Sequence, residues 1–567
     1  MKKVFKYFSR YKKECVLAPL FKLIEALLEL FIPIIVADII DRGVNGDNPK
    51  VVVTGVLLMV LLGAIGLGFS LLGQYFSAKA AVGYSSDLRG ALYKKLMGLP
   101  LKETDKIGNA KMITAMTSDV GKVQSGVNLA LRLLLRSPFV VLGAFIAALI
   151  ISPKLGIIFG VAILALAIIV VIIMKITMPK FSTAQKMLDG ISQVARENLS
   201  GVRVIRAFGA EETEVETYGK KVEEHEKFQN FTAKISSLLN PLTFVVVNVA
   251  IVFLLYFGGV KVELGILTQG AIIALYDYLS QILVELVKFA NLVVSISKAL
   301  ASARRIDEIL EIKSTKDGDY VREYDGSFIR FDNVFASYDG SEVLERINLE
   351  IEMGQTVGVI GGTGSGKSTL VNLIAGLYKP SAGNLFINGK NTLAIPSTER
   401  KNLVAIALQR PALFKGTVKS NLQIGKKDAS EQDFERALTI SQAKDFVAEK
   451  GGIDCLVEQG ARNFSGGQKQ RLALARAIIS KPKILILDDS SSALDYVTDL
   501  NLRLALKNQD FKQTVIIVSQ RTASVKDTDK IIVLDDGEIV GVGTHTWLRE
   551  NCEVYREIDD SQKAGDV

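Results

Sequence analysis

The stretch QTVGVIGGTGSGKSTLVNLIAGLY, residues 355–378, decides the fold of the C-terminal half of this chain. A short apolar strand, Val357–Ile360, runs into a glycine-rich loop, Gly361–Ser368, that fits the pattern GxxxxGK[ST], and a helix is expected over Thr369–Gly376. Glycines in such a loop let backbone N–H groups close on phosphates, while the following helix points its positive end at the same anion. The stretch therefore predicts an α/β nucleotide-binding domain.

Two side chains of this loop have separate expected tasks. Lys367 is expected to reach the outer phosphates, and Ser368 is expected to place its hydroxyl on Mg²⁺. The predicted nucleotide-binding residues of the segment are Gly361, Gly362, Thr363, Gly364, Ser365, Gly366, Lys367, Ser368 and Thr369.

A second anchor for the metal is expected in ILILDDSSSALD, residues 484–495. The continuous aliphatic run Ile484–Leu487 predicts a strand that is buried on both faces. Asp488 stands at the carboxyl end of that strand, where it is placed to hold Mg²⁺ through water beside the phosphate loop. The next residue is a second acid, Asp489.

The composition of the whole chain indicates a membrane protein. It has 567 residues, 49% of them hydrophobic, and a formal net charge of +8. The length predicts two or more domains. A basic balance is also typical of nucleic-acid binding, but here the positive charge lies at the N-terminus and between apolar blocks, which favours membrane orientation and no nucleic-acid partner. The cysteines, which are Cys15, Cys455 and Cys552, lie in separate regions and predict free thiols in a reducing compartment.

Apolar blocks in the N-terminal half are long enough to cross a bilayer, since about 20 helical residues span the hydrocarbon core. An N-terminal segment that alternates basic and apolar residues is expected to lie along the membrane surface. The predicted domains are a transmembrane domain over 1–312, a linker over 313–327 and a nucleotide-binding domain over 328–567. Six spans are predicted near 16–42, 54–78, 130–151, 155–178, 241–262 and 268–291.

The segments after the second and fourth blocks are long, basic and helical in period, so the positive-inside rule places them in the cytoplasm. Both termini and the nucleotide-binding domain are then cytoplasmic, in a protein of the cell membrane. Turns around Leu101–Lys106 and Phe208–Glu212 are expected to dock on the soluble domain. The predicted fold class is a membrane α-helical bundle of six helices with long cytoplasmic extensions, followed by a cytoplasmic α/β P-loop ATPase domain.

Several predicted spans contain charges. An acid at the bilayer centre costs about 2.5–3.5 kcal/mol, so the faces that carry such residues are expected to avoid lipid. A watery substrate path lined by acids and internal ion pairing between helices are both consistent with the spacing. Arg132 and Arg136 are expected to snorkel at the inner boundary. Residues on one face of the first and sixth blocks, proposed as the substrate path, are Glu25, Glu29, Asp277, Gln281 and Glu285.

Between the two nucleotide motifs lies NFSGGQKQRLALARAI, residues 463–478. With those motifs and the six blocks, it resembles one family over essentially the whole chain, the ATP-binding cassette (ABC) exporters. FSGGQ resembles the family signature LSGGQ, which binds the nucleotide of a partner through Ser465, Gly466, Gly467 and Gln468. Tyr338 matches the aromatic residue that stacks on adenine, and Gln409 matches the glutamine that touches Mg²⁺. SALD, residues 492–495, matches the D-loop. The resemblance implies ATP and Mg²⁺ as cofactors.

The sequence departs from the family at two positions. The residue after the metal-binding aspartate is normally Glu, which polarises the attacking water, and here it is Asp489. A carboxylate one methylene shorter withdraws by roughly a bond length, and a misplacement of about 1 Å costs up to a hundredfold in rate. The family's switch histidine follows the strand VIIVS, and here Gln520 stands there. Gln can donate a hydrogen bond but carries no charge.

Cassettes of the resembled family pair head to tail, so each ATP lies between the phosphate loop of one and the signature of the other. This chain has a weakened site of its own and an intact signature to lend. The hypothesis is therefore a heterodimeric half-exporter of amphipathic compounds or drugs, related most to multidrug exporters. The alternatives are a slow homodimer, a lipid or peptide exporter subunit, and a nucleotide-sensing regulatory membrane subunit.

Overall fold

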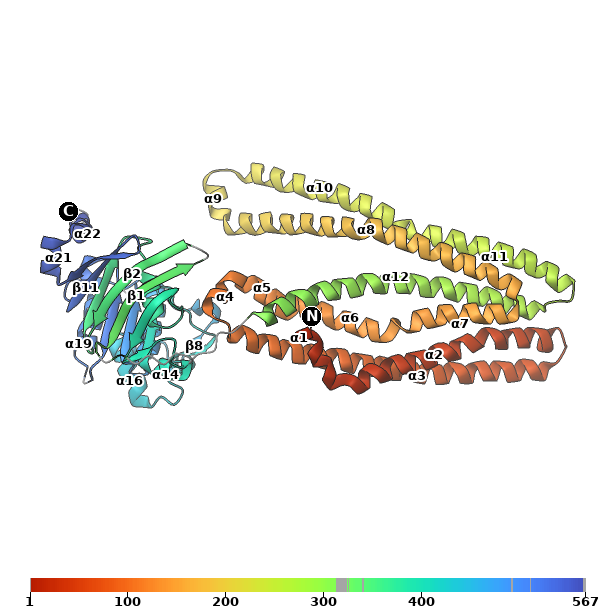
Figure 1. Ribbon diagram of the computed structural model, residues 1–567, viewed down its shortest axis with the longest axis horizontal. Coiled ribbons are helices and arrows are strands. Elements are labelled where there is room, and N and C mark those ends of the chain that lie inside the picture. The colour runs from red at the N-terminus through yellow and green to blue at the C-terminus, as the bar shows by residue number, and fades with distance from the viewer. Residues whose placement is uncertain are drawn as a thin grey trace. The chain divides into compact units, whose positions relative to one another are not determined.

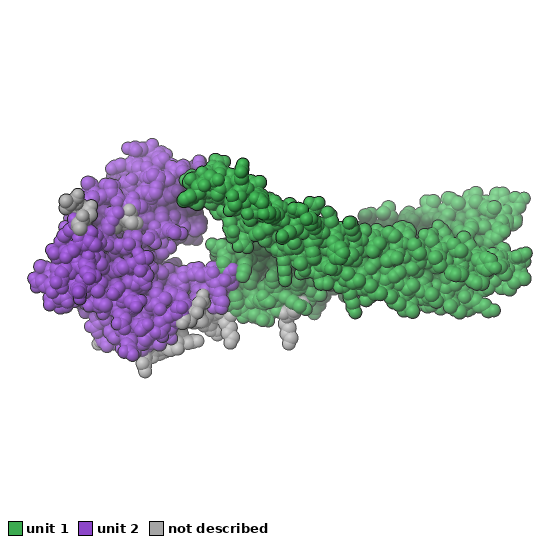
Figure 2. All heavy atoms as spheres, turned by 90° about the horizontal axis from the view of Figure 1, so that it is seen from above, with its two compact units in different colours: residues 1–98, 108–312 green, residues 99–107, 313–567 purple. Residues whose placement is uncertain are grey.

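The computed structural model describes residues 2–312, 324, 326–338, 341–490, 493–509 and 511–563. The chain divides into two compact units, one of residues 1–98 and 108–312 and one of residues 99–107 and 313–567 (Figure 2). Most of the predicted linker 313–327, and Ser492 of the predicted D-loop, lie outside the described residues. The domain boundaries expected from the sequence therefore stay a prediction.

The first unit is helical throughout. Figure 1 shows its long helices running side by side, with α8 beside α10 and α11, and with α12 beside α6 and α7. Proline opens α3 and α8, where its missing N–H costs no helical hydrogen bond. The helices of this unit are α1 (Lys2–Phe5), η1 (Lys6–Tyr11), α2 (Lys12–Asp38), η2 (Ile39–Val44), α3 (Pro49–Met97), α5 (Asn109–Thr114), η3 (Ala115–Asp119), α6 (Val120–Leu133), α7 (Arg136–Ile151), α8 (Pro153–Ser200), α9 (Val202–Ala207), α10 (Glu211–Ser237), α11 (Leu239–Glu263) and α12 (Gln269–Glu311).

Five helical stretches of the described residues are long and apolar enough to cross a membrane. They are Pro49–Met97, Asn109–Ile151, Pro153–Ser200, Glu211–Glu263 and Gln269–Glu311. These stretches contain the second to sixth predicted spans. Helix α2, which contains most of the first predicted span, is not among them, because Lys22, Glu25 and Glu29 interrupt its apolar run. The first span therefore stays a prediction.

The second unit is built on sheets. A six-stranded sheet has the order β12-β11-β3-β10-β9-β6, a four-stranded sheet has the order β2-β1-β4-β5, and β7 pairs with β8. Its strands are β1 (Ile329–Tyr338), β2 (Ser341–Ile351), β3 (Thr356–Gly361), β4 (Ala382–Ile387), β5 (Lys390–Asn391), β6 (Val404–Ala407), β7 (Gly416–Thr417), β8 (Leu456–Val457), β9 (Ile484–Asp488), β10 (Thr514–Val518), β11 (Lys530–Asp535) and β12 (Glu538–Gly543).

Helices pack on both faces of the six-stranded sheet, since its aliphatic side chains belong to two separate hydrophobic clusters. The helices of the unit are α4 (Leu101–Ile107), α13 (Lys367–Ile374), α14 (Ser397–Leu403), α15 (Val418–Leu422), α16 (Glu431–Ile440), α17 (Lys444–Glu449), α18 (Gly466–Ile478), α19 (Tyr496–Lys507), α20 (Thr522–Val525), α21 (His545–Asn551) and α22 (Glu553–Lys563).

The register of the six-stranded sheet brings the predicted motifs to one edge. Strands β3, β10, β9 and β6 are all parallel to their neighbours. Their carboxyl ends therefore lie together, and ligands of open α/β sheets bind at that edge. The phosphate loop follows β3, Asp488 ends β9, Gln520 follows β10 and Gln409 follows β6.

The short helix α4 belongs to the second unit, although the chain enters and leaves it through the first. Tyr378, at the end of the quoted stretch, donates a hydrogen bond from its hydroxyl to Asp105 Oδ2 at 2.5 Å. Lys102 Nζ donates to the carbonyl of Ser337 at 3.4 Å. The turn expected near Leu101–Lys106 is therefore a helix that packs on the nucleotide-binding domain. The expected docking of the turn at Phe208–Glu212, which joins α9 to α10, stays a prediction.

Candidate nucleotide-binding site

The phosphate loop depends on glycine for its shape. Gly366 has a φ of +93°, and a Cβ there would lie 2.5 Å from Leu344 Cδ2. Only glycine meets both the left-handed backbone and the close approach without strain. Helix α13 begins at the next residue, Lys367, so its first N–H groups open onto the loop. The helix expected over Thr369–Gly376 thus begins two residues earlier, and the loop before it has the glycine-dependent shape expected of an anion cradle.

The ammonium group of Lys367 lies inside this cradle. Its Nζ donates to the carbonyl of Gly361 at 3.0 Å and to Ser365 Oγ at 3.2 Å. The residue is only 8% exposed, and burial lowers the pKa of Lys367 below its ordinary value. A polyphosphate in the cradle would oppose that shift, because an adjacent anion favours the charged amine.

Ser368 and Asp488 converge as the sequence predicts, since Ser368 Oγ donates to Asp488 Oδ1 at 3.4 Å. Burial raises the pKa of Asp488, and the neighbouring Asp489 raises it further. A hydroxyl and a carboxylate are the hard oxygen ligands that Mg²⁺ prefers. A divalent cation here would also relieve the unfavourable burial of the Asp488 charge. The residues therefore fit Mg²⁺, which would neutralise the outer phosphates of a bound nucleotide.

Gln409 meets the second acid of the quoted pair. Its Nε2 donates to Asp489 Oδ2 at 2.9 Å. The backbone of Asp489 is left-handed, with a φ of +45°, and its N–H donates to the carbonyl of Val518 at 3.0 Å. Asp tolerates this conformation better than most side chains do. The glutamine and the short acid thus lie together beside Asp488.

Helix α18 holds the segment that carries Gln409. Gln470 Nε2 donates to the carbonyl of Leu408 at 3.2 Å, and Arg476 Nη1 donates to the carbonyl of Ala412 at 2.8 Å. Gln470 is buried, with 1% of its surface exposed. Neither residue was singled out from the sequence, although both lie inside the quoted stretch 463–478. The available signal was the amide of Gln470 on an otherwise aliphatic face of the expected helix.

Tyr338, which the sequence predicts to stack on adenine, lies beside the phosphate loop. It ends β1, and burial raises the pKa of its phenol despite a hydrogen bond with Thr369. Its ring meets that of Tyr378 edge to face, with centroids 5.0 Å apart. Tyr378, which the sequence analysis did not single out, therefore contacts both the predicted adenine partner and helix α4.

The signature residues form the start of helix α18. Ser465 Oγ accepts from Gln468 N at 3.4 Å, while Gln468 Oε1 accepts from Ser465 N at 3.1 Å. This reciprocal capping box fixes the helix end. Phe464, which replaces the usual Leu, is buried and packs against Phe446. No described hydrogen bond joins Ser465–Gln468 to the phosphate loop of the same chain.

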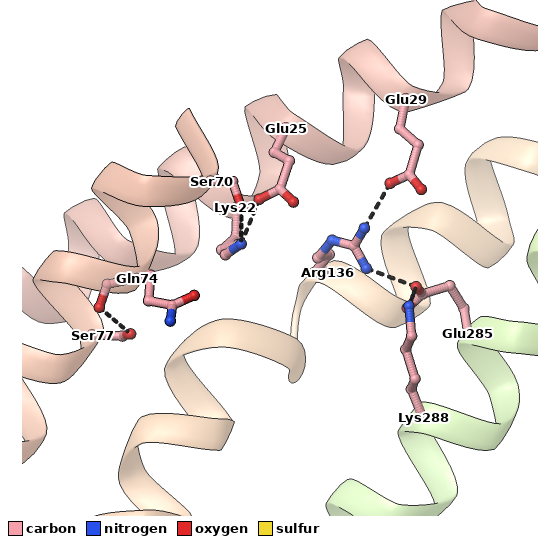
Figure 3. Close-up of polar contacts among 9 residues, drawn as sticks. All are labelled: Lys22, Glu25, Glu29, Ser70, Gln74, Ser77, Arg136, Glu285 and Lys288. Atoms are coloured by element: carbon pink, nitrogen blue, oxygen red, sulfur yellow. Dashed lines mark hydrogen bonds and ion pairs between the residues drawn. The ribbon is translucent and has the colours of Figure 1, made fainter. Parts of the chain in front are cut away.

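Charged residues of the membrane unit form two separate groups of ion pairs (Figure 3). Arg136 lies between two acids, with Nη1 2.7 Å from Glu285 Oε1 and Nη2 2.6 Å from Glu29 Oε2. Lys288 pairs with Glu285 at 2.9 Å, and Lys22 pairs with Glu25 at 2.6 Å. Every one of the three acids thus has a basic partner. The sequence was consistent with either internal ion pairs or a substrate path, and for these three acids the structure shows ion pairs.

The expectation that Arg136 snorkels is wrong. Arg136 is only 8% exposed. Its neighbour Ser137 donates from Oγ to Glu285, the acid that also binds Arg136, at 2.7 Å. A guanidinium held by two carboxylates gains more from these charge-assisted bonds than from reaching for the interface. Asp277 and Gln281 differ from these glutamates. Asp277 forms no salt bridge within the described part of the first unit. The side-chain oxygen of Gln281 is buried there without a hydrogen-bond partner.

Comparisons with known proteins agree along the whole chain. A model of the ABC transporter transmembrane region matches residues 15–286, and a model of the ABC transporter family matches residues 344–492. An uncharacterized ABC transporter ATP-binding protein of Mycobacterium tuberculosis is 32% identical over 564 residues, which cover 97% of this chain and 96% of that protein. The uncharacterized ABC transporter ATP-binding protein YfiB of Bacillus subtilis is 29% identical over 570 residues, covering 99% and 98%.

The fold is also that of a solved exporter. A bacterial Atm1-family ABC exporter with ATP bound has a TM-score of 0.82 to this structure at 22% identity, covering 97% of this chain and 98% of that one. One transmembrane region and one ATPase domain of an ATP-hydrolysing translocase family are thus fused in a single polypeptide. The chain belongs to the ABC transporter family, as a half-transporter with the exporter fold.

Proposed function

We propose that this chain is the degenerate-site subunit of a heterodimeric ABC exporter in the cell membrane. In this proposal its own phosphate loop binds ATP and Mg²⁺ but hydrolyses ATP poorly, and its signature completes the active site of a second half-transporter. The observation that carries the proposal is the pair of residues at the reacting end of the site, Asp489 and Gln520, which replace the family's Glu and His.

The geometry around Asp489 supports weak catalysis. A general base must lie within about 2.6–3.2 Å of the proton that it removes. One carboxylate oxygen of Asp489 already accepts from Gln409 at 2.9 Å, and the side chain has one methylene less with which to reach a water. Gln520 cannot supply the charge of an imidazolium. ATP is therefore bound by the cradle and Asp488 without being cleaved efficiently.

The intact signature supports the pairing with a different subunit. Ser465 and Gln468 shape a helix start whose free N–H groups suit an anion, and in this family that anion belongs to the partner's nucleotide. A subunit that keeps this surface while losing its own base benefits only if the partner retains the base. The proposed partner therefore carries Glu and His at the two corresponding positions.

Purified alone and reconstituted in lipid, this chain is expected to bind ATP and to hydrolyse it at least about a hundredfold more slowly than the complex with its partner. ATP binding and phosphate release by the same preparation measure the two steps separately. Fast phosphate release by the chain alone would contradict the division of labour. Failure of vesicles containing both subunits to move any substrate would favour a regulatory subunit instead.

Replacement Asp489→Glu is expected to raise the rate of ATP hydrolysis at this site by less than about tenfold, because the switch position still lacks a charge. The left-handed backbone at φ +45° also disfavours the longer side chain there. Single-turnover hydrolysis by the variant measures the gain, and Asp489→Asn, which keeps the size, is the matched control. Full recovery by the single change would show that reach alone limits the site.

The substrate proposed is an amphipathic compound or drug. Fewer acids are available to attract a positively charged group than the sequence suggested. Glu25, Glu29 and Glu285 are committed to basic partners within 2.9 Å. Within the described part of the chain, neither Asp277 nor Gln281, four residues apart on α12, is held by a basic side chain. We therefore assign the attraction of a positively charged substrate group to Asp277 alone among the acids of the predicted path.

A further inference from the structure

The last described helix, α22, reaches back to the segment that follows β10. Its Gln562 donates from Nε2 to the carbonyl of Gln520 at 2.7 Å. The same carboxamide accepts through Oε1 from Thr522 N at 2.9 Å and from Thr522 Oγ1 at 3.1 Å. One side chain thus holds the backbone on both sides of Arg521. Gln562 itself lies outside the nucleotide motifs, but Gln520 is the switch position of the site.

Helix α22 is itself firmly anchored, so it can serve as a fixed reference. Tyr555 is fully buried, and its hydroxyl lies 2.7 Å from His545 Nδ1. Asp559 is 3% exposed and pairs with Arg549 at 3.2 Å and with Lys563 at 2.7 Å. Burial alone would raise the pKa of Asp559, but hydrogen bonds from Lys563 and Thr522 outweigh it and lower the pKa.

The start of helix α20 needs an external partner, and Gln562 is that partner. Arg521 is the N-cap of α20 and makes no side-chain capping bond. The first N–H groups of a helix have no acceptor within the helix. Gln562 supplies an acceptor to Thr522 and a donor to Gln520 at the same time, because a carboxamide has its acceptor oxygen and its donor nitrogen side by side. The segment at the end of β10 therefore takes its conformation from α22.

We propose that Gln562 is a positioning residue for Gln520. By fixing the carbonyl of Gln520 and the first turn of α20, it sets the direction in which the Gln520 side chain leaves the backbone. In the ATP site of the proposed function, on which this inference rests, that side chain faces the γ-phosphate. Gln562 acts through Gln520 and does not touch the nucleotide itself.

The test compares ATP with ADP, because only ATP has the γ-phosphate. The full-length chain in lipid nanodiscs is titrated with ATP and with ADP, each displacing a fluorescent ATP analogue. Gln562→Ala is expected to weaken ATP binding about 5- to 10-fold, the value of roughly one hydrogen bond, and to change ADP binding less than about twofold. Gln562→Glu keeps the acceptor but loses the donor, so an intermediate loss is expected.

Two further variants make the test specific. Ser561→Ala is the matched control, because the Ser561 hydroxyl donates only within its own helix, to the carbonyl of Ile558 at 2.9 Å. It is expected to bind both nucleotides as the unchanged chain does. In a Gln520→Ala background, Gln562→Ala is expected to weaken ATP binding by less than about a further twofold. The reason is that Gln562 acts through the Gln520 side chain, which is already absent. If Gln562→Ala does not fold, Gln562→Glu carries the same comparison.

Equal weakening of ATP and ADP, or full multiplication of the Gln520 and Gln562 effects, would overturn the proposal and leave Gln562 a purely structural residue. These results are distinct from failure of the proposed function. A chain that distinguishes ATP from ADP through Gln562 but hydrolyses ATP quickly would contradict the degenerate site and leave the positioning role intact. A chain that does not bind ATP would overturn both.

Discussion

Replacement Gly466→Asp in this chain is expected to lower the ATPase rate of the proposed two-subunit transporter by at least about 100-fold. Gly466 is the first residue of α18, whose free N–H groups would face the γ-phosphate held by the partner. A carboxylate there repels that phosphate and competes for its donors. The measurement is steady-state phosphate release by the purified complex with saturating ATP.

The structure indicates that this variant folds. A Cβ at Gly466 would meet no atom within 4 Å, and an acid in the first turn of a helix is favourable. The effect on rate would therefore come from the site and not from unfolding.

The contrasting variant is Lys367→Ala, which removes the ammonium from the cradle of this chain's own site. It is expected to abolish ATP binding there and to lower the overall rate less than about tenfold, since in the proposed function the efficient site is built on the partner's phosphate loop. A larger loss from Lys367→Ala than from Gly466→Asp would reverse the proposed roles of the two sites.

Replacement Arg136→Ala is expected to destabilise the membrane unit by about 3 kcal/mol. The guanidinium is buried between Glu285 and Glu29, and its removal leaves acids without their main partner. We expect the lower end of the 3–5 kcal/mol range because Lys288 and Ser137 still contact Glu285. Thermal unfolding in detergent measures the change, with the loss of the monodisperse peak in size-exclusion chromatography as the readout.

A second substitution separates charge from packing in this prediction. Arg136→Ala combined with Glu285→Gln is expected to be more stable than Arg136→Ala alone, because the more deeply buried of the two acids is then neutral. Arg10→Ala is the matched control, since Arg10 pairs with Asp87 at 3.1 Å but is 72% exposed, and such pairs contribute at most about 1 kcal/mol. Equal destabilisation by Arg10→Ala and Arg136→Ala would show that burial does not govern these pairs.

The nucleotide motifs were predictable because each is a local pattern. The phosphate loop needs glycine at Gly366 and a helix that begins at Lys367, and both requirements are met by neighbouring residues. The strand that carries Asp488 was predictable from its aliphatic run, since a parallel strand with both faces covered contains little else. The gathering of these motifs at one sheet edge follows from parallel strand order.

The charges in the membrane unit could not be settled in the same way. Helical spacing put Glu25 and Glu29 on one face, but whether an acid lines a path or pairs with a base depends on which helix packs opposite. Arg136 and Glu285 are 149 residues apart in the chain, and only the packing of α7 beside α12 brings them together.

The sequence by itself determined the two-part architecture, the phosphate loop, the acid predicted to bind the metal and the departures at Asp489 and Gln520, because these are residue identities within short continuous segments. Only the tertiary structure decided that Arg136 is buried between two carboxylates, that Tyr378 reaches Asp105 and that Gln562 holds the carbonyl of Gln520. Hydrogen bonds and ion pairs act over about 3–4 Å in space, and the folded chain brings residues to that distance without regard to their separation in sequence.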